Sequence, residues 1–257
     1  MTSQIEQAKL ALSLMDLTSL NDNDTDKNII DLCSNAASEY GQVAAVCVYP
    51  QFIETALDSL HSHNAKGVKV ATVTNFPHGK NDPILAQKET EKAVLMGAHE
   101  VDVVFPYQAL MAGDKKVGID LVAASREACG DKAQLKVIIE SGVLKSESHI
   151  RQASEICIEQ GAHFIKTSTG KVDVNATLEA TSYMLTSIKE SGLNVGFKAA
   201  GGIKTLDQAS DYLALANKIM GEGWVNQNTF RFGASSLLAN LIASIKGETH
   251  TPSTGSY

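Results

Sequence analysis

Short β-branched runs alternate with longer amphipathic stretches throughout the chain, and this alternation limits the possible folds more than any other feature. Eight such runs follow one another at spacings of roughly 25 to 36 residues, and a segment with helical periodicity follows each. The predicted strands lie at 14–17, 43–49, 68–76, 100–105, 135–140, within 162–171, at 195–199 and at 229–234. Eight strands, each followed by a helix, are the count of an α/β (β/α)8 TIM barrel. We therefore predict a single barrel domain over residues 1–246 and a flexible C-terminal tail over 247–257.

A doubly wound open sheet shows the same alternation, so the loops must decide between the two folds. The open-sheet fold usually carries a glycine-rich cofactor loop after its first strand, but no GxGxxG follows residues 14–17. The Gly170-Lys171 pair also lacks the earlier glycine and the following Ser or Thr of a nucleotide-binding P-loop. The barrel is therefore the favoured fold, and no cofactor is expected.

Charge and composition exclude several classes of partner. The chain has 22 Lys and Arg against 29 Asp and Glu, a net charge of −7, and no basic block that would favour nucleic acid. No stretch of about 18 apolar residues occurs, so no membrane span is expected. The N-terminus lacks the pattern of a secretory signal, and the four cysteines form no CxxC pair. Cysteines without such pairs are typical of a reducing compartment, and we predict a cytoplasmic protein.

Charged residues inside the predicted strands are informative, because parallel barrel strands are covered on both faces and usually read as apolar. These residues are Asp16, Glu100, Asp102, Lys136, Glu140, Lys166, Lys198 and Arg231. Side chains alternate along a strand, which directs Asp102, Lys166 and Lys198 toward the barrel axis when their apolar neighbours face the helices. A structural ion-pair network is the commoner role for any one such residue, and we favour it for Lys136 and Glu140. Asp102, Lys166 and Lys198 lie toward the carboxyl ends of their strands, where barrel active sites are built.

Two converging lysines have a chemical use. A free lysine has a pKa of about 10.4 and is nearly all ammonium at neutral pH. A second cation ~4 Å away, at an effective dielectric of ~20, disfavours the ammonium by about 4 kcal/mol. The neutral amine then attacks a carbonyl to form a Schiff base, and the protonated imine accepts electrons without a metal. Asp102 is expected to carry protons and to hold the second lysine, whereas these residues alone leave open which lysine attacks.

Glycine and serine residues after the last two predicted strands indicate a phosphate site. Gly201 and Gly202 permit close backbone approach, and the run Gly233-Ala234-Ser235-Ser236 leads into the final helix. Backbone N–H groups, a helix N-terminus and two hydroxyls make an anion site at the usual place for phosphate in a barrel. The residues expected to complete this site are Thr169, Gly170 and Lys171. No HExxH motif or compact His/Cys cluster occurs, so no metal site is predicted.

Five stretches of the sequence closely resemble the deoxyribose-phosphate aldolases, which are class I aldolases of deoxynucleoside breakdown. These stretches are EVDVVFPYQALMAG, KVIIESG, FIKTSTGK, GFKAAGG and RFGASSLL. The resemblance runs from LMDLTSLN near the start to Tyr257 and covers essentially the whole chain. It implies a (β/α)8 barrel and the reversible, metal-independent cleavage of 2-deoxy-D-ribose 5-phosphate to D-glyceraldehyde 3-phosphate and acetaldehyde. It also implies a homodimer.

The same motifs imply roles for individual residues. Lys166 in FIKTSTGK resembles the Schiff-base lysine, and Lys198 in GFKAAGG resembles the second lysine that lowers its pKa. Asp102 in EVDVVF resembles the proton donor and acceptor. The resemblance places Asp16 near the site and gives Tyr257, at the end of the tail, a part in proton transfer. The residues that it implies in phosphate contacts are Gly201, Gly202, Ser235 and Ser236.

Two other functions stay open on the sequence. One is a sugar-phosphate isomerase or epimerase barrel, in which Asp102 is the base and the lysines only stabilise charge. The other is a non-catalytic barrel that binds a sugar phosphate without turning it over. Small molecules are the expected partners in each case: a sugar phosphate and, for the aldolase, aldehydes.

Overall fold

A closed barrel of eight parallel strands forms the centre of the molecule, which the computed structural model describes from residue 3 to residue 248. Its strands are β1 (Met15–Thr18), β4 (Ala45–Val48), β5 (Lys69–Thr74), β6 (Glu100–Val104), β7 (Gln134–Ile138), β8 (Phe164–Lys166), β9 (Gly196–Ala200) and β10 (Phe230–Ala234). Each strand pairs with the next one along this series, and β1 pairs with β10 to close the ring. The predicted TIM barrel is confirmed.

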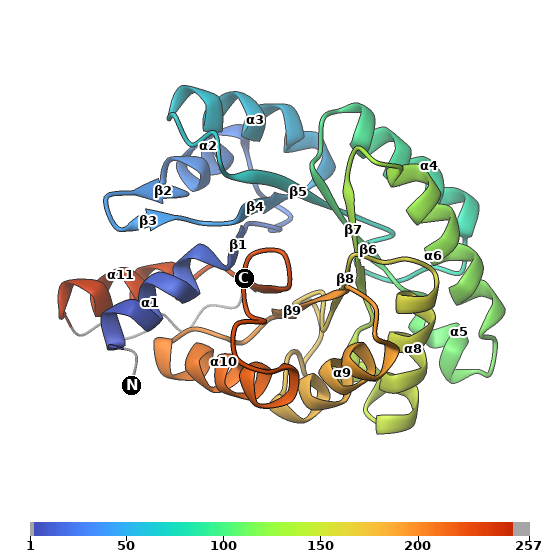
Figure 1. Cartoon of the computed structure of the whole chain (residues 1–257). Helices are drawn as coiled ribbons and strands as arrows, with labels where there is room; N and C mark the ends of the chain where they lie inside the picture. Colours follow the sequence, from blue (N-terminus) through green and yellow to red (C-terminus); the bar gives the residue numbers. More distant parts are fainter. Residues whose placement is uncertain (1–2, 249–257) are drawn as a thin grey trace.

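Helices surround the barrel on its outside (Figure 1). The longer ones after the barrel strands are α2 (Asp26–Ser34), α3 (Ile53–Ser62), α4 (Pro83–Leu95), α6 (Lys116–Cys129), α8 (Glu147–Glu159), α9 (Leu178–Ser191), α10 (Leu206–Met220) and α11 (Leu237–Lys246). Each returns the chain across the barrel wall, so that the following strand runs parallel to the one before it. The eightfold repeat of the sequence therefore corresponds to eight strand–helix units.

Several short elements lie outside the predicted repeat. They are α1 (Gln4–Ser13), the hairpin strands β2 (Ala37–Ser38) and β3 (Gly41–Gln42), the 3₁₀ helix η1 (Pro50–Phe52), α5 (Tyr107–Met111) and α7 (Ser141–Leu144). Apart from α1, which packs against α10 and α11, these elements are too short to produce a periodic pattern. The short elements were therefore not predictable from periodicity.

Side-chain caps explain why several predicted helices begin where they do. Thr205 precedes α10, and its hydroxyl accepts from the Gln208 N–H while the Gln208 side chain accepts from the Thr205 N–H. Thr177 caps α9 in the same position, and Gly192 ends α9 in the left-handed conformation. A capping residue in the sequence therefore marks each end of α9.

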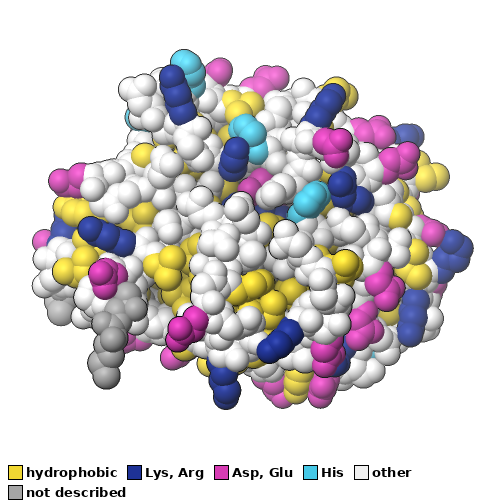
Figure 2. Space-filling model, viewed as in Figure 1, with side chains coloured by type: hydrophobic (Ala, Val, Ile, Leu, Met, Phe, Trp, Pro, Cys, Tyr) yellow, Lys and Arg dark blue, Asp and Glu magenta, His cyan; other side chains and the backbone are white. Residues whose placement is uncertain are grey.

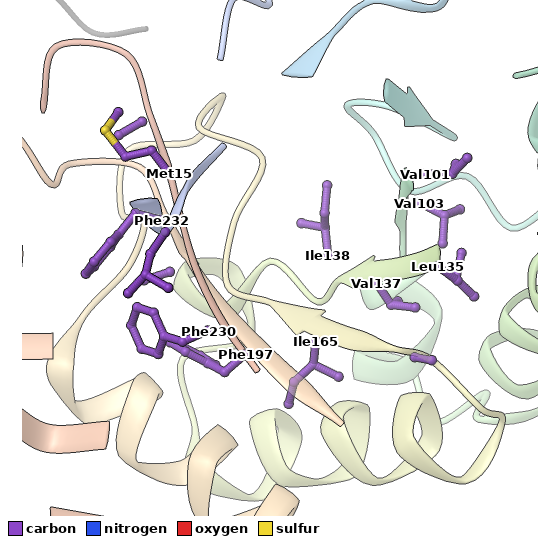
Figure 3. Close-up of a cluster of buried hydrophobic side chains, with 14 of the residues drawn as sticks. Met15, Val101, Val103, Leu135, Val137, Ile138, Ile165, Phe197, Phe230 and Phe232 are labelled. Carbon is purple, nitrogen blue, oxygen red and sulfur yellow. The ribbon is translucent and has the colours of Figure 1, made fainter. Parts of the chain in front are cut away.

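An apolar layer fills the space between the strands and the helices. Figure 3 shows part of this layer, including Val101 and Val103 of β6, Leu135 and Val137 of β7, and Ile165 of β8. The residues that alternate with them along the strands are charged: Asp102, Lys136 and Lys166. Because side chains alternate across a strand, these three point toward the barrel axis, where their charged groups meet.

Charges of both signs are interspersed on the face of the molecule in Figure 2, and neither sign forms a single block there. Single apolar side chains are also exposed, the most open being Leu95 on α4, and such scattered exposure is normal for a folded protein. Within residues 3–248, no helix combines the length and the apolar composition needed to cross a bilayer.

Candidate active site

The amino groups of two lysines meet at one carboxylate oxygen of an aspartate inside the barrel. Lys166 ends β8, Lys198 lies in β9, and the two residues are partners in the parallel register of these strands. Each Nζ atom donates to Oδ2 of Asp102 in β6 at 2.8 Å. Lys166 is 3% exposed and Lys198 is 0% exposed, so the Lys166 amine is the one at the edge of the interior. The structure thus brings together the two lysines and the aspartate that the sequence singled out.

Asp16 binds the far side of the Lys198 ammonium. Its Oδ2 accepts from the Lys198 Nζ at 2.5 Å, and its Oδ1 accepts from the Arg231 guanidinium at 2.6 Å. Asp16 is fully buried on β1, close to the site as expected, but it contacts Lys198 and Arg231 rather than a phosphate pocket. Lys198 therefore has two carboxylates, whereas Lys166 has one.

Lys136 completes the network on the other oxygen of Asp102. Its Nζ lies 2.9 Å from Asp102 Oδ1 and 2.5 Å from Glu100 Oε2. The remaining oxygen of Glu100 accepts from Arg231 at 2.9 Å, and the Arg231 guanidinium also lies over the Phe164 ring. Lys136 therefore has the structural ion-pair role that the sequence analysis favoured.

Burial and unequal pairing separate the pKa values of the two lysines. Burial lowers the pKa of Lys166, the nearby Lys198 ammonium lowers it further, and the single carboxylate of Asp102 does not offset both. Burial acts in the same direction on Lys198, but Asp102 and Asp16 together outweigh it and raise its pKa well above the ordinary value. The neighbouring lysines, Lys136 foremost, hold the pKa of Asp102 well below its usual range, despite its burial. Of the two lysines, Lys166 is therefore the one that loses its proton more readily, beside a charged Lys198.

Removing Arg231 should destabilise the fold, because it pairs with two buried carboxylates. We expect Arg231→Met to lower the free energy of unfolding by about 3 kcal/mol, the lower end for a broken buried pair, since Asp16 and Glu100 each keep a lysine. Urea unfolding measures the change. The matched control is Lys27→Met, which breaks an exposed pair with Asp31 (82% and 61% exposed) and should cost about 0.5 kcal/mol at most. Equal losses in the two variants would contradict the structural role of the network.

A cavity lies at the carboxyl ends of β9 and β10, and we call it the loop cavity. It encloses about 500 Å³ of space, open solvent included. Among its lining residues are Gly170, Gly201, Gly202, Gly233, Ser235 and Ser236, all of them predicted. Ser236 precedes α11 without making a side-chain capping bond, so its own helix does not engage the hydroxyl. Lys204 also lines the cavity and adds a cation that the sequence analysis missed, although it lies in the loop directly after the paired glycines.

The backbone at Gly201 and Gly202 requires glycine. Their φ angles are +86° and +85°, a left-handed conformation that other residues rarely adopt. A Cβ atom at position 201 would also lie 2.6 Å from the Cβ of Asn175. Two consecutive left-handed glycines leave the backbone bare at the cavity wall, as close approach to an anion requires.

Thr169 and Lys171, which were expected to complete the phosphate site, contact other groups. The Thr169 hydroxyl donates to Glu140 Oε2 at 2.6 Å, and its backbone N–H donates to Oε1 of the same carboxylate. Lys171 directs its Nζ to the carbonyl oxygen of Leu20, 2.7 Å away. Glu140 itself is buried with a left-handed backbone (φ 55°) and positions the loop that carries Gly170. Neither Thr169 nor Lys171 lines the loop cavity.

Small apolar side chains form the interior wall on β4 and β5. Ala45 and Cys47 of β4 and Ala71 and Val73 of β5 form one buried cluster together with Leu20. Burial raises the pKa of the Cys47 thiol, which keeps it protonated among the nearby lysines and Asp102. Cys47 therefore packs in an apolar wall of mostly small side chains beside the charged centre. Its other members were not singled out from the sequence, although small residues alternate in both strands.

Residues 249–257 of the predicted tail, Tyr257 included, lie outside the described residues. The barrel ends with α11 at Lys246, and Gly247 follows in the left-handed conformation. The parts expected of Tyr257 and of the tail therefore stay predictions.

Comparisons with known proteins match this chain over most of its length. A family model described as "DeoC/LacD family aldolase" matches residues 10–241. The solved structure named "QR15, an Aldolase" is 30% identical, with a TM-score of 0.76 over 92% of this chain and 96% of that chain. A Toxoplasma gondii protein, provisionally named a deoxyribose-phosphate aldolase, has a TM-score of 0.87 at 23% identity over 96% of each chain. The tetrameric deoxyribose phosphate aldolase of Aeropyrum pernix has a TM-score of 0.73 at 23% identity, covering 94% of this chain and 92% of that one. At 23% identity, the similarity to these last two structures bears on the fold alone.

Proposed function

We propose, from the premise that this chain belongs to the DeoC/LacD family of aldolases, that it is a class I deoxyribose-phosphate aldolase. The proposed reaction is the reversible cleavage of 2-deoxy-D-ribose 5-phosphate to D-glyceraldehyde 3-phosphate and acetaldehyde, in the breakdown of deoxynucleosides. One observation carries the proposal: Lys166 shares a single carboxylate oxygen with Lys198, while Lys198 has a second carboxylate of its own. This inequality supports Lys166 as the nucleophile, a choice that the residue pattern left open.

The proposed chemistry begins with the neutral Lys166 amine. It attacks the C1 aldehyde of the open-chain substrate, and loss of water gives a protonated imine. Removal of the O3 proton breaks the C2–C3 bond, and the electron pair passes to the imine to give an enamine. D-glyceraldehyde 3-phosphate leaves with C3 as its aldehyde carbon. Protonation of the enamine carbon and hydrolysis then release acetaldehyde and restore Lys166.

The proton transfers are assigned to Asp102 and Lys198 as a pair. The Lys198 ammonium supplies a proton, and the ionised Asp102 accepts one, directly or through water. Both groups lie within hydrogen-bond distance of one another, and Asp102 lies 2.8 Å from the Lys166 Nζ. The small apolar wall at Cys47 and Val73 suits the two-carbon fragment that stays on the lysine. The resemblance adds Tyr257 to these transfers as a further prediction.

The loop cavity is the proposed binding site for the substrate phosphate. Its left-handed glycines allow close backbone approach, and the start of α11 and the Lys204 side chain favour negative charge. The contacts proposed here come from Gly170, Gly201, Gly202, Gly233, Ser235 and Ser236. Thr169 and Lys171 hold the loop instead, through Glu140 and the Leu20 carbonyl.

Removing both serine hydroxyls tests this assignment. A hydrogen bond to a charged group contributes about 1.5 kcal/mol or more, so Ser235→Ala with Ser236→Ala should lower kcat/KM for the phosphorylated substrate about 100-fold. Activity on unphosphorylated 2-deoxyribose should not change, because this substrate lacks the group that the hydroxyls bind. Ser148→Ala on α8 is the control. An equal loss on both substrates would show that the serines shape the site without binding phosphate.

The function itself is tested by product analysis. The purified protein should release equal amounts of acetaldehyde and D-glyceraldehyde 3-phosphate from 2-deoxy-D-ribose 5-phosphate, at the same rate with and without a chelator. An isomerase or epimerase would give a rearranged sugar phosphate and no acetaldehyde. A binding protein would show affinity for the sugar phosphate without turnover. Release of acetaldehyde only in the presence of a divalent metal would contradict the class I assignment.

A further inference from the structure

A large hollow opens at the opposite end of the barrel, where the strands begin. It encloses about 970 Å³ of space, open solvent included, and we call it the amino-terminal mouth. The lining residues that matter here are Lys69, His99, Glu100, Arg126, Lys132 and His163. Lys69 and Glu100 are the first residues of β5 and β6, and the two histidines directly precede β6 and β8. The mouth is thus separate from the lysine centre and from the loop cavity, which lie toward the carboxyl ends.

Two histidines at the mouth are fixed in the same tautomer. The Nδ1 atom of His99 accepts the backbone N–H of Val70 at 3.0 Å, and Nδ1 of His163 accepts the N–H of Leu135 at 2.9 Å. A ring nitrogen that accepts a hydrogen bond carries no proton, so a neutral ring must carry its proton on Nε2. Burial lowers the pKa of both rings and keeps them neutral, with nearby cations acting in the same direction. Each ring therefore presents an N–H donor.

Three cations line the mouth without a carboxylate partner in residues 3–248. Lys69 and Lys132 are exposed, and Arg126 donates only to the carbonyl oxygen of Gly130, at 2.7 Å. Their charges lower the pKa of the adjacent histidines, Lys69 that of His99 and Arg126 that of His163. The concentration of unpaired positive charge contrasts with a whole-chain charge of −7.

Two acidic residues line the mouth, Glu100 and Asp131, and they do not cancel this charge, because the exposed Asp131 is one carboxylate against three cations. Glu100 is buried and already bonded on one side to Arg231 and on the other to Lys136. Its negative charge therefore faces the interior network, and the open part of the mouth keeps the cations and the two N–H donors. A hollow with this lining attracts anions and offers them directed hydrogen bonds.

We propose that the amino-terminal mouth is a second binding site, for a small oxyanion that carries several phosphate or carboxylate charges. The histidines precede strands that are two positions apart in the barrel, and adjacent strands lie about 4.8 Å apart, so the donors are separated by roughly 10 Å. A single phosphate cannot span this distance, whereas an extended anion with charges at both ends can. The ligand class is therefore a polyphosphate, a phosphorylated metabolite with a second anionic group, or a polycarboxylate.

Calorimetric titration of the full chain with inorganic tripolyphosphate and, separately, with citrate tests the proposal. Imidazole ¹⁵N spectra identify the location, because binding at the mouth must shift the Nε2 resonances of His99 and His163. Lys69→Gln with Lys132→Gln should weaken binding at least about tenfold and leave aldolase activity unchanged. Lys88→Gln with Lys218→Gln removes the same charge from exposed helix positions and should leave the affinity unchanged.

Each outcome of these experiments either supports or overturns the proposed anion site. Binding of tripolyphosphate alone assigns phosphate ligands to the mouth, and binding of citrate alone assigns polycarboxylates. An anion that leaves both histidine resonances in place, or that loses affinity equally in the two double variants, occupies only the loop cavity or the general surface. Either result overturns the proposal, as does the absence of binding by both anions.

Discussion

Lys166→Met should abolish aldol cleavage, with a fall in kcat of at least about 10⁴-fold. Lys166 is the one lysine of the centre whose pKa is lowered, and Lys198 stays charged between Asp102 and Asp16. Lys166 is therefore the amine of the centre that most readily loses its proton to attack the substrate. The fold should survive, because Asp102 keeps Lys136 and Lys198 as partners. A steady-state assay with 2-deoxy-D-ribose 5-phosphate measures the loss.

The control for this experiment is Lys88→Met, which removes an exposed lysine of α4 and should leave kcat unchanged. Circular dichroism and urea unfolding of both variants separate lost chemistry from lost structure. Activity of Lys166→Met within tenfold of the parent chain would contradict the assignment of the nucleophile.

Lys198→Met should lower kcat by about 10²- to 10⁴-fold and move the acid limb of the remaining pH–activity profile to higher pH. The direction of this shift in pH follows from two effects on the pKa of Lys166. Loss of the Lys198 ammonium removes a charge that lowers the Lys166 pKa, and it leaves Asp102 to pair more closely with Lys166, which raises that pKa. Because the neutral amine is the reactive form, a higher pKa requires a higher pH for the same activity.

Lys204→Met serves as a comparison in the same assay. It removes a lysine that lines the loop cavity, so it should raise KM for the phosphorylated substrate without moving the pH profile. A Lys198→Met profile that coincides with that of the parent chain would show that Lys198 does not control the ionisation of Lys166.

The barrel and the inward direction of the charged residues were predictable, because both follow from local periodicity. Asp102 and Lys198 each stand between apolar neighbours in a strand, Lys166 follows the apolar Ile165, and alternation alone sends the three to the axis. The pairing that distinguishes the two lysines was not predictable. It depends on Asp16, which is 182 positions from Lys198 in the chain and reaches it only because β1 closes the barrel against β10.

The loop after β8 separates three residues that stand together in the sequence. Thr169, Gly170 and Lys171 are consecutive, and the sequence analysis treated them as one phosphate-binding group. In the structure only Gly170 lines the loop cavity, because the buried Glu140 binds Thr169 and the Leu20 carbonyl binds Lys171. Both contacts join parts of the chain that are distant in sequence, and no local pattern predicts them.

The central claim is that Lys166 forms the Schiff base, and a reductive trap tests it most directly. Borohydride added together with acetaldehyde should reduce the imine and leave one stable ethyl group per chain. Mass spectrometry of the whole chain gives the stoichiometry, and peptide mapping gives the position. The proposed mechanism predicts a single adduct on Lys166 and none on Lys198 or Lys136. An adduct on Lys198, or no adduct on the catalytically active protein, would contradict it.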